Sequence, residues 1–193
     1  RMLEQQLLRR LELARALAAT AQLPPWVGSP WFLCVKQPWA ALLMDGIKSV
    51  ENRSARVATG VWHVVIATTY VTAAEHEQAL ADRPLRLSGL DLTQYEKHAV
   101  PTGSVIGLVK FGSEIAPRPR SESDLWYNGA PDRGWTVSQI IKFDTPIPGA
   151  RGCMATRTGT EAFVRNNSSG MGEKGTVYEQ LVATLDRVTR SNG

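Results

Sequence analysis

The apolar stretches of this sequence are short, and each begins directly after a glycine or a proline. Most are rich in valine, isoleucine and aromatic residues, which favours β-strands. They do not alternate regularly with helices, so a parallel sheet of repeated strand–helix–strand units is not expected. We therefore predict an α+β fold: a small β-barrel of five to six strands, with short interspersed helices and terminal helices. The predicted strands cover residues 31–35, 61–67, 104–111, 135–143 and 153–156.

The length of 193 residues suits one domain with added helices. Over residues 2–21 apolar side chains recur at three- and four-residue steps, which predicts an amphipathic helix that ends at Pro24 and Pro25. A second helix with one apolar face is predicted to begin at Thr176. We divide the chain into an N-terminal helix and hinge (1–28), a barrel (29–165), and a flexible loop with a C-terminal helix (166–193).

Two connecting segments are informative. Thr72 and Glu75 have the spacing of a capping box, which predicts a helix that extends to about residue 82. The polar segment 112–134 contains Arg118 and Arg120, and it interrupts the strands as a long excursion. It is predicted either to be flexible or to lie over a binding face.

The bulk composition narrows the class of protein. No stretch approaches the roughly 18 apolar residues of a membrane-spanning helix, so we expect a soluble protein without membrane contact. Cys34 and Cys153 are isolated, which predicts buried thiols and an intracellular location, cytoplasmic or nuclear. Neither the cysteines nor the three histidines have the spacing of metal ligands, and we expect no metal and no cofactor. The net charge of +4 permits a polyanionic partner but equally suits a surface that only needs to be soluble.

The densest polar cluster lies between residues 36 and 53. Proline at 38 and glycine at 46 each fix a turn, and these turns are expected to bring the end of a strand and a short helix together. A tryptophan offers a stacking face, amide and carboxylate groups can read a base edge, and cations can hold a phosphate. The predicted site residues of this cluster are Gln37, Pro38, Trp39, Lys48, Glu51 and Arg53.

A purely structural interpretation of the same residues is also open. In a regular strand Glu51 and Arg53 lie on one face and Lys48 on the other. The first two side chains could then only neutralise each other at a barrel rim, with Trp39 in the core.

The run from Val35 to Arg53 resembles the signature of the ASCH family. In that signature a Gln-Pro-Trp or Gln-Pro-Tyr turn leads through a short helix to Gly-x-Lys-x-x-Glu-x-Arg, which matches Gly46, Lys48, Glu51 and Arg53. The similarity extends over about residues 31–157. It implies a PUA-like β-barrel with a cleft on the Lys-Glu-Arg motif, for which RNA binding has been proposed in the family.

Some bacterial relatives of this family hydrolyse the acetyl amide of N4-acetylcytidine. They use the motif lysine, a threonine three residues after it and a distant glutamate. Lys48 matches the lysine, but Glu51 stands at the threonine position. A nucleoside amidohydrolase with Lys48 and Glu51 as catalytic residues is therefore the second hypothesis, behind a non-catalytic module that binds RNA or another single-stranded nucleic acid.

Further residues are weaker candidates for the same cleft. His76 and His98 are expected to be solvated, whereas His63 is expected to face the barrel or the cleft. A third hypothesis is a protein-interaction module of a transcription or RNA-processing coregulator, with partners bound through the terminal helices. We expect a monomer. The additional candidate contacts are His63, Thr68, Trp135 and Arg157.

Overall fold

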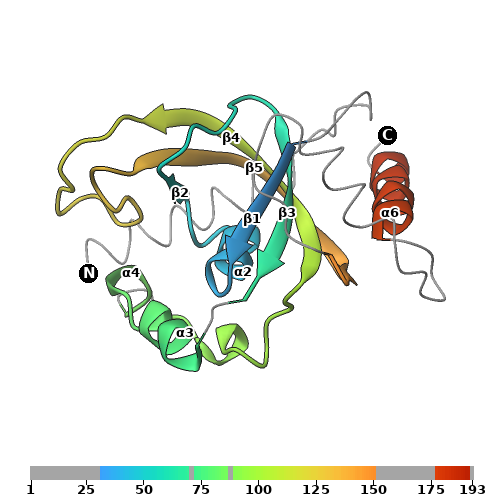
Figure 1. The fold of residues 1–193 in the computed structure, drawn as a ribbon, viewed down its shortest axis with the longest axis horizontal. Coiled ribbons are helices and arrows are strands. Elements are labelled where there is room, and N and C mark those ends of the chain that lie inside the picture. Colours follow the sequence, from blue (N-terminus) through green and yellow to red (C-terminus); the bar gives the residue numbers. More distant parts are fainter. Residues whose placement is uncertain (1–30, 70–71, 87–88, 151–176, 192–193) are drawn as a thin grey trace.

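The computed structural model describes residues 31–69, 72–86, 89–150 and 177–191. The elements appear in Figure 1 in chain order. They are β1 (Trp31–Lys36), α2 (Trp39–Met44), β2 (Val50–Arg53), β3 (Trp62–Thr68), α3 (Ala73–Leu80), α4 (Arg83–Arg86), a short 3-10 helix η1 (Thr93–Tyr95), β4 (Ser104–Ile115), β5 (Arg133–Pro148) and α6 (Val177–Ser191).

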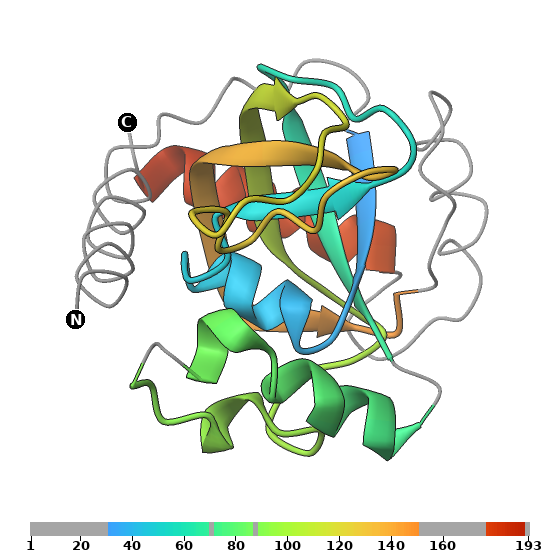
Figure 2. The ribbon, with the colours of Figure 1, turned by 90° about the vertical axis from the view of Figure 1, so that its left-hand side faces the viewer.

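The five strands form one sheet in the order β1-β3-β4-β5-β2. The β1–β3 pair is parallel and the other three pairs are antiparallel. The sheet curls into a half-barrel (Figures 1 and 2), and its edge strands β1 and β2 are not paired with each other in the described part of the chain. The prediction of a small α+β, PUA-like barrel with five to six strands and short helices is confirmed.

Helix α2 packs into the concave side of the sheet. Its residues Ala40, Leu43 and Met44 belong to an apolar cluster with side chains from β1, β3, β4 and β5. The approach is close at Gly107 of β4, where a Cβ atom would lie 2.7 Å from Met44 Sδ and 2.3 Å from the carbonyl oxygen of Ile141. Only glycine fits there, so this position lets α2 and β5 come close enough to shape the hollow beside them.

Helix α6 covers a second apolar cluster. Leu181 and Leu185 are buried there against Val64, Leu108 and Phe143. The apolar face predicted for the C-terminal helix is therefore used in packing on the sheet. Figure 1 shows α6 beside the sheet, far from α3 and α4.

The segment between β3 and β4 holds the capping box predicted from Thr72 and Glu75. The Thr72 hydroxyl accepts a hydrogen bond from the backbone N–H of Glu75, and the Glu75 carboxylate accepts one in return, so that α3 begins at Ala73. The expectation that His76 is solvated is wrong. Its side chain is buried, with Nε2 2.6 Å from the carbonyl oxygen of Tyr95, because it ties α3 to η1.

Several predicted elements lie outside the described residues. These are the N-terminal helix, the strand at 153–156, a short helix at 158–164 and the loop before α6. Among the helices that are described, none combines the length and the hydropathy needed to cross a bilayer.

Candidate functional site

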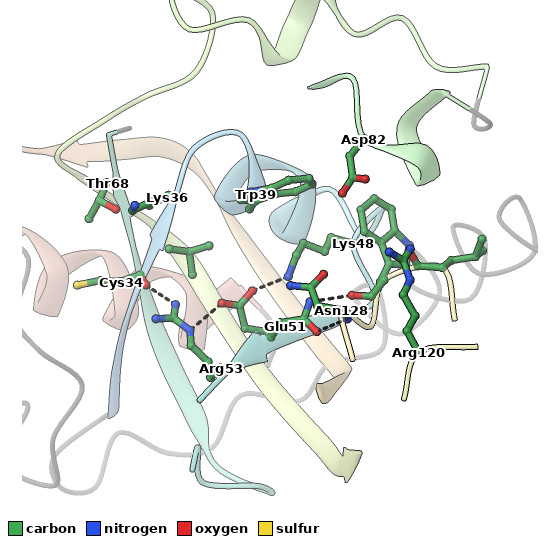
Figure 3. A pocket seen from close by; sticks show the side chains of 14 residues that line it. Cys34, Lys36, Trp39, Lys48, Glu51, Arg53, Thr68, Asp82, Arg120 and Asn128 are labelled. Atoms are coloured by element: carbon green, nitrogen blue, oxygen red, sulfur yellow. Dashed lines mark hydrogen bonds and ion pairs between the residues drawn. The ribbon is translucent and has the colours of Figure 1, made fainter. Parts of the chain in front are cut away.

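A cavity of about 470 Å³ opens between the edge strands β1 and β2 (Figure 3). Its volume is within the range of small-molecule sites in proteins. It lies where the sheet stops short of closing, since three consecutive residues of each edge strand line it. The lining residues are Cys34, Val35, Lys36, Trp39, Lys48, Glu51, Asn52, Arg53, Thr68, Asp82, Arg120, Leu125, Trp126 and Asn128.

The turn from β1 into α2 positions one side of this cavity. Gln37 is 1% exposed, its amide donates to the carbonyl oxygen of Pro101 at 2.7 Å, and its side-chain oxygen accepts from the N–H of Ala41 at 3.0 Å. A buried amide whose donor and acceptor are both engaged is a structural brace. Pro38 is buried as well. Both residues shape the turn that presents Trp39, and neither lines the cavity.

The exit from α2 positions the opposite side. The N–H groups of Ile47 and Lys48 both donate to the carbonyl oxygen of Leu42, and Gly46 between them and the helix has φ of 71°. Such a left-handed residue ends a helix at little cost only when it is glycine. The chain then enters β2 with Lys48 directed inward.

Lys48, Glu51 and Arg53 form a continuous ionic chain, which we call the floor of the cavity (Figure 3). Lys48 Nζ lies 2.5 Å from one carboxylate oxygen of Glu51 and also donates to the carbonyl oxygen of Val50 at 2.6 Å. Arg53 Nε donates to the other carboxylate oxygen at 2.8 Å, and its guanidinium also donates to the carbonyl oxygen of Cys34. The side chain of Arg53 thus bridges the two edge strands that the backbone leaves apart.

The floor is buried and positively charged. Side-chain exposure is 6% for both Lys48 and Glu51 and 29% for Arg53. Burial alone would raise the pKa of Glu51, but the neighbouring Lys48 and Arg53 outweigh it and hold that pKa below its usual value. Glu51 is therefore an anion, and the two cations exceed it by one charge. Over the whole cavity, four cations (Lys36, Lys48, Arg53 and Arg120) face two carboxylates (Glu51 and Asp82), which leaves two positive charges.

Residues 116–132, which we call the β4–β5 loop, form the outer wall. Four of the lining residues come from it: Arg120, Leu125, Trp126 and Asn128. The Trp126 ring meets Trp39 edge to face, with centroids 6.4 Å apart and an interplanar angle of 83°. Aromatic faces from α2 and from this loop therefore meet above the floor.

The structure brings together only part of the predicted set of site residues. Trp39, Lys48, Glu51, Arg53 and Thr68 line the cavity. Asn52, Arg120, Trp126 and Asn128 were not predicted as site residues. Asn52 lies inside the recognised motif, but no pattern in the sequence indicates that residues more than 60 positions later fold over it.

Two of the predicted contacts lie in the core instead of the cavity. His63 is 1% exposed and packs against Phe111 at a centroid distance of 5.3 Å, and burial lowers its pKa to about 4, so it is a neutral core residue at neutral pH. Trp135 is 2% exposed within the cluster around α2. It pairs with Glu51 across β2 and β5, which places its side chain beside the floor without exposing it to the cavity. Arg157 lies outside the described residues.

Comparisons with known proteins add one structural likeness. No protein-family model matches the chain, and no curated protein matches it. Among solved structures, the chain is similar to a crystal structure of a mutant of ZmASCH from Zymomonas mobilis, with 12% sequence identity and a TM-score of 0.39. The match covers 81% of this chain and 98% of the other. ZmASCH carries the name of the family that the motif of residues 35–53 resembles, and at this identity the likeness says nothing of a ligand or a reaction.

Proposed function

We propose that this protein binds single-stranded RNA or a nucleotide, with one base held in the cavity between Trp39 and the β4–β5 loop. The supporting observation is the floor, in which a buried cluster with one excess positive charge lies under an aromatic wall. A base offers a π-face for stacking, and its phosphate offers the anion that such a floor attracts. No single feature of the surface charge would distinguish these two halves of a nucleotide.

The three positive groups nearest the floor have different exposures, which suggests different tasks. Lys48 is buried and already engaged by Glu51 and Val50, so it holds the floor together and contributes its charge at short range. Arg53 is 29% exposed, and Lys36 is exposed at the cavity edge. The latter two are the groups that we expect to meet phosphate oxygens directly.

The contacts of Glu51 weigh against the amidohydrolase. A general base must have a free oxygen within reach of a water, but each carboxylate oxygen of Glu51 is bonded to a cation. A carboxylate held with a lowered pKa is also a weaker base. We therefore favour binding over catalysis. Incubation with N4-acetylcytidine and chromatographic detection of cytidine would reverse this preference if cytidine accumulated.

Fluorescence anisotropy with a labelled single-stranded RNA at low salt tests the proposal. Removing the buried charge in Lys48→Met should weaken binding roughly 10- to 100-fold, because charge-assisted contacts contribute about 1.5–3 kcal/mol each. Lys142→Met is the matched control. Lys142 is 58% exposed, pairs with Asp45 and does not line the cavity, so its loss should change affinity less than about twofold.

Two results would contradict the proposal. Flat titrations of the wild-type protein would remove the function itself. Equal affinity of the Lys48→Met variant and the wild type would show that RNA binds elsewhere on the molecule.

A further inference from the structure

The β4–β5 loop has a fixed shape of its own. Asp124 accepts two hydrogen bonds from the Arg118 guanidinium, both at 2.7 Å, and these bonds hold the pKa of Asp124 well below its usual range. The Tyr127 hydroxyl accepts from the N–H of Arg118 at 3.1 Å and donates to the carbonyl oxygen of Asp132 at 2.9 Å, across the base of the loop. The loop is thus a preformed wall, which suits a surface that must present side chains in register.

Close packing inside the loop reinforces this shape. Gly129 has φ of 95°, and a Cβ atom there would lie 3.1 Å from both the backbone nitrogen and the Cβ of Arg120. Two parts of the loop therefore touch at a position where only glycine fits without strain. This contact places Arg120 next to Asn128, and both residues line the cavity.

Asn52 fastens this wall to the floor. Its side-chain nitrogen donates to the carbonyl oxygen of Trp126 at 2.7 Å, and its side-chain oxygen accepts from the N–H of Asn128 at 3.0 Å (Figure 3). One carboxamide thus holds the loop backbone on both sides of residue 127. A side chain needs a donor and an acceptor at this length to do so, which aspartate and leucine lack.

The loop needs such a fastening because Trp126 is buried at a cost. Its indole N–H is sealed from solvent without a hydrogen-bond partner among the described residues. A buried unpaired donor destabilises the arrangement that contains it. The two hydrogen bonds of Asn52 oppose release of Trp126 from its place against Trp39.

We propose that the β4–β5 loop, positioned by Asn52, determines which base the cavity accepts. This inference rests on the proposed nucleotide binding and adds the part of the site that gives selectivity. The Asn128 carboxamide lines the cavity and makes no side-chain hydrogen bond to a described residue. A carboxamide offers a donor and an acceptor together, which is the pattern that distinguishes one base edge from another. The charges of the floor, in contrast, respond to any phosphate.

Isothermal titration calorimetry with AMP, CMP, GMP and UMP tests this division. We expect the wild-type protein to prefer one base roughly tenfold, and Asn128→Ala to remove that preference by weakening the favoured nucleotide alone. Asn52→Ala should flatten the ranking in the same way. Lys48→Met should lower all four affinities by a similar factor and keep the ranking. Glu122→Gln, a change at an exposed loop residue that does not line the cavity, should leave both affinity and ranking as they are.

A second measurement separates positioning from general loss of structure. Amide hydrogen exchange of Asn128 should accelerate at least tenfold in Asn52→Ala, because its N–H loses its acceptor, while exchange in β3 stays unchanged. Asn52→Asp keeps that acceptor and loses only the donor to Trp126, so its Asn128 exchange should stay closer to wild type. The added charge of aspartate affects all four nucleotides alike, and the ratio of affinities is therefore the quantity to compare.

Three outcomes would overturn the inference. Wild-type protein that binds all four nucleotides equally would show that the site has no base selectivity, while leaving the proposed function intact. A uniform loss across the four nucleotides in Asn128→Ala would make the loop a general contact surface. Absence of binding to every nucleotide and to single-stranded RNA would remove the proposed function and this inference with it.

Discussion

The floor and the β4–β5 loop face the same cavity but are built on different principles. The floor comes from six consecutive residues, 48–53, and its contacts are ionic and buried. The loop approaches it from 74 residues away in the chain, is mostly exposed, and is attached through the neutral hydrogen bonds of one asparagine. Local sequence thus supplies the charge of the site, whereas a distant segment supplies most of its shape.

This difference predicts how each region tolerates change. A buried ionic chain loses much stability when one member is removed, because the partner charges remain desolvated. A surface loop tolerates substitution at its tip, so recognition residues on it can vary while the scaffold stays folded. Loss of stability and loss of selectivity should therefore separate between the two regions.

The strongest test of this separation is Glu51→Gln. It leaves two cations in the buried floor without their anion and should lower the free energy of unfolding by about 3–5 kcal/mol. Urea denaturation at pH 7 measures the change. A surface pair gives the matched control: Glu114 and Arg133 form an ion pair with side chains that are more than a quarter exposed, and Glu114→Gln should cost less than about 1 kcal/mol. Equal effects of the two substitutions would mean that the floor is solvated and that the contrast with the loop is only one of sequence position.

Acid distinguishes the floor from the core beneath it. The pKa of His63 is lowered by burial to about 4 in the folded protein, against about 6.5 in the unfolded chain. Between these values the unfolded chain binds a proton that the folded protein does not, so stability falls as the pH decreases, by a total on the order of 3 kcal/mol. Glu51 also has a lowered pKa, but its contribution is lost only below its ordinary value of 4.5.

Urea midpoints measured at intervals from pH 7 to pH 5 isolate the histidine. His63→Leu should flatten the decline over this range, whereas His98→Gln, at a side chain that is 81% exposed, should keep it. A decline that persists unchanged in His63→Leu would assign the acid sensitivity to another group.

The sequence predicted the strands better than it predicted the site. Four apolar runs that follow a glycine or proline correspond to β1, β3, β4 and β5, because burial on a sheet selects such residues regardless of the distant context. The polar strand β2 was expected only as an extended or irregular segment. It is recognisable from its motif and not from its hydrophobicity.

The predicted contacts that lie in the core failed for a physical reason. Residues 62–67 of β3 are all buried, so no alternation of polar and apolar residues indicates which face His63 occupies. Gln37 was interpreted as a ligand contact because it is polar, but its amide is used by the backbone of the turn. For residues 112–134 the sequence left two options, and the structure shows the segment folded over the floor. Its placement depends on hydrogen bonds with Asn52, which no local pattern reveals.

The smallest expected effect concerns which region holds the phosphates. Figure 3 shows Lys36 and Arg120 on opposite sides of the cavity, one next to β1 and the other on the loop. Each phosphate contact on a single strand contributes about 0.7 to the slope of log affinity against log salt concentration. If the floor side binds the phosphate and the loop reads the base, Lys36→Ala should reduce the slope by about 0.7 and Arg120→Ala should leave it nearly unchanged. Anisotropy titrations with single-stranded RNA between 50 and 200 mM salt (roughly the range in which such slopes are resolved) measure both variants. The reverse result would place the phosphate against the loop, and base selectivity would then have to come from the side of the cavity formed by β1 and α2.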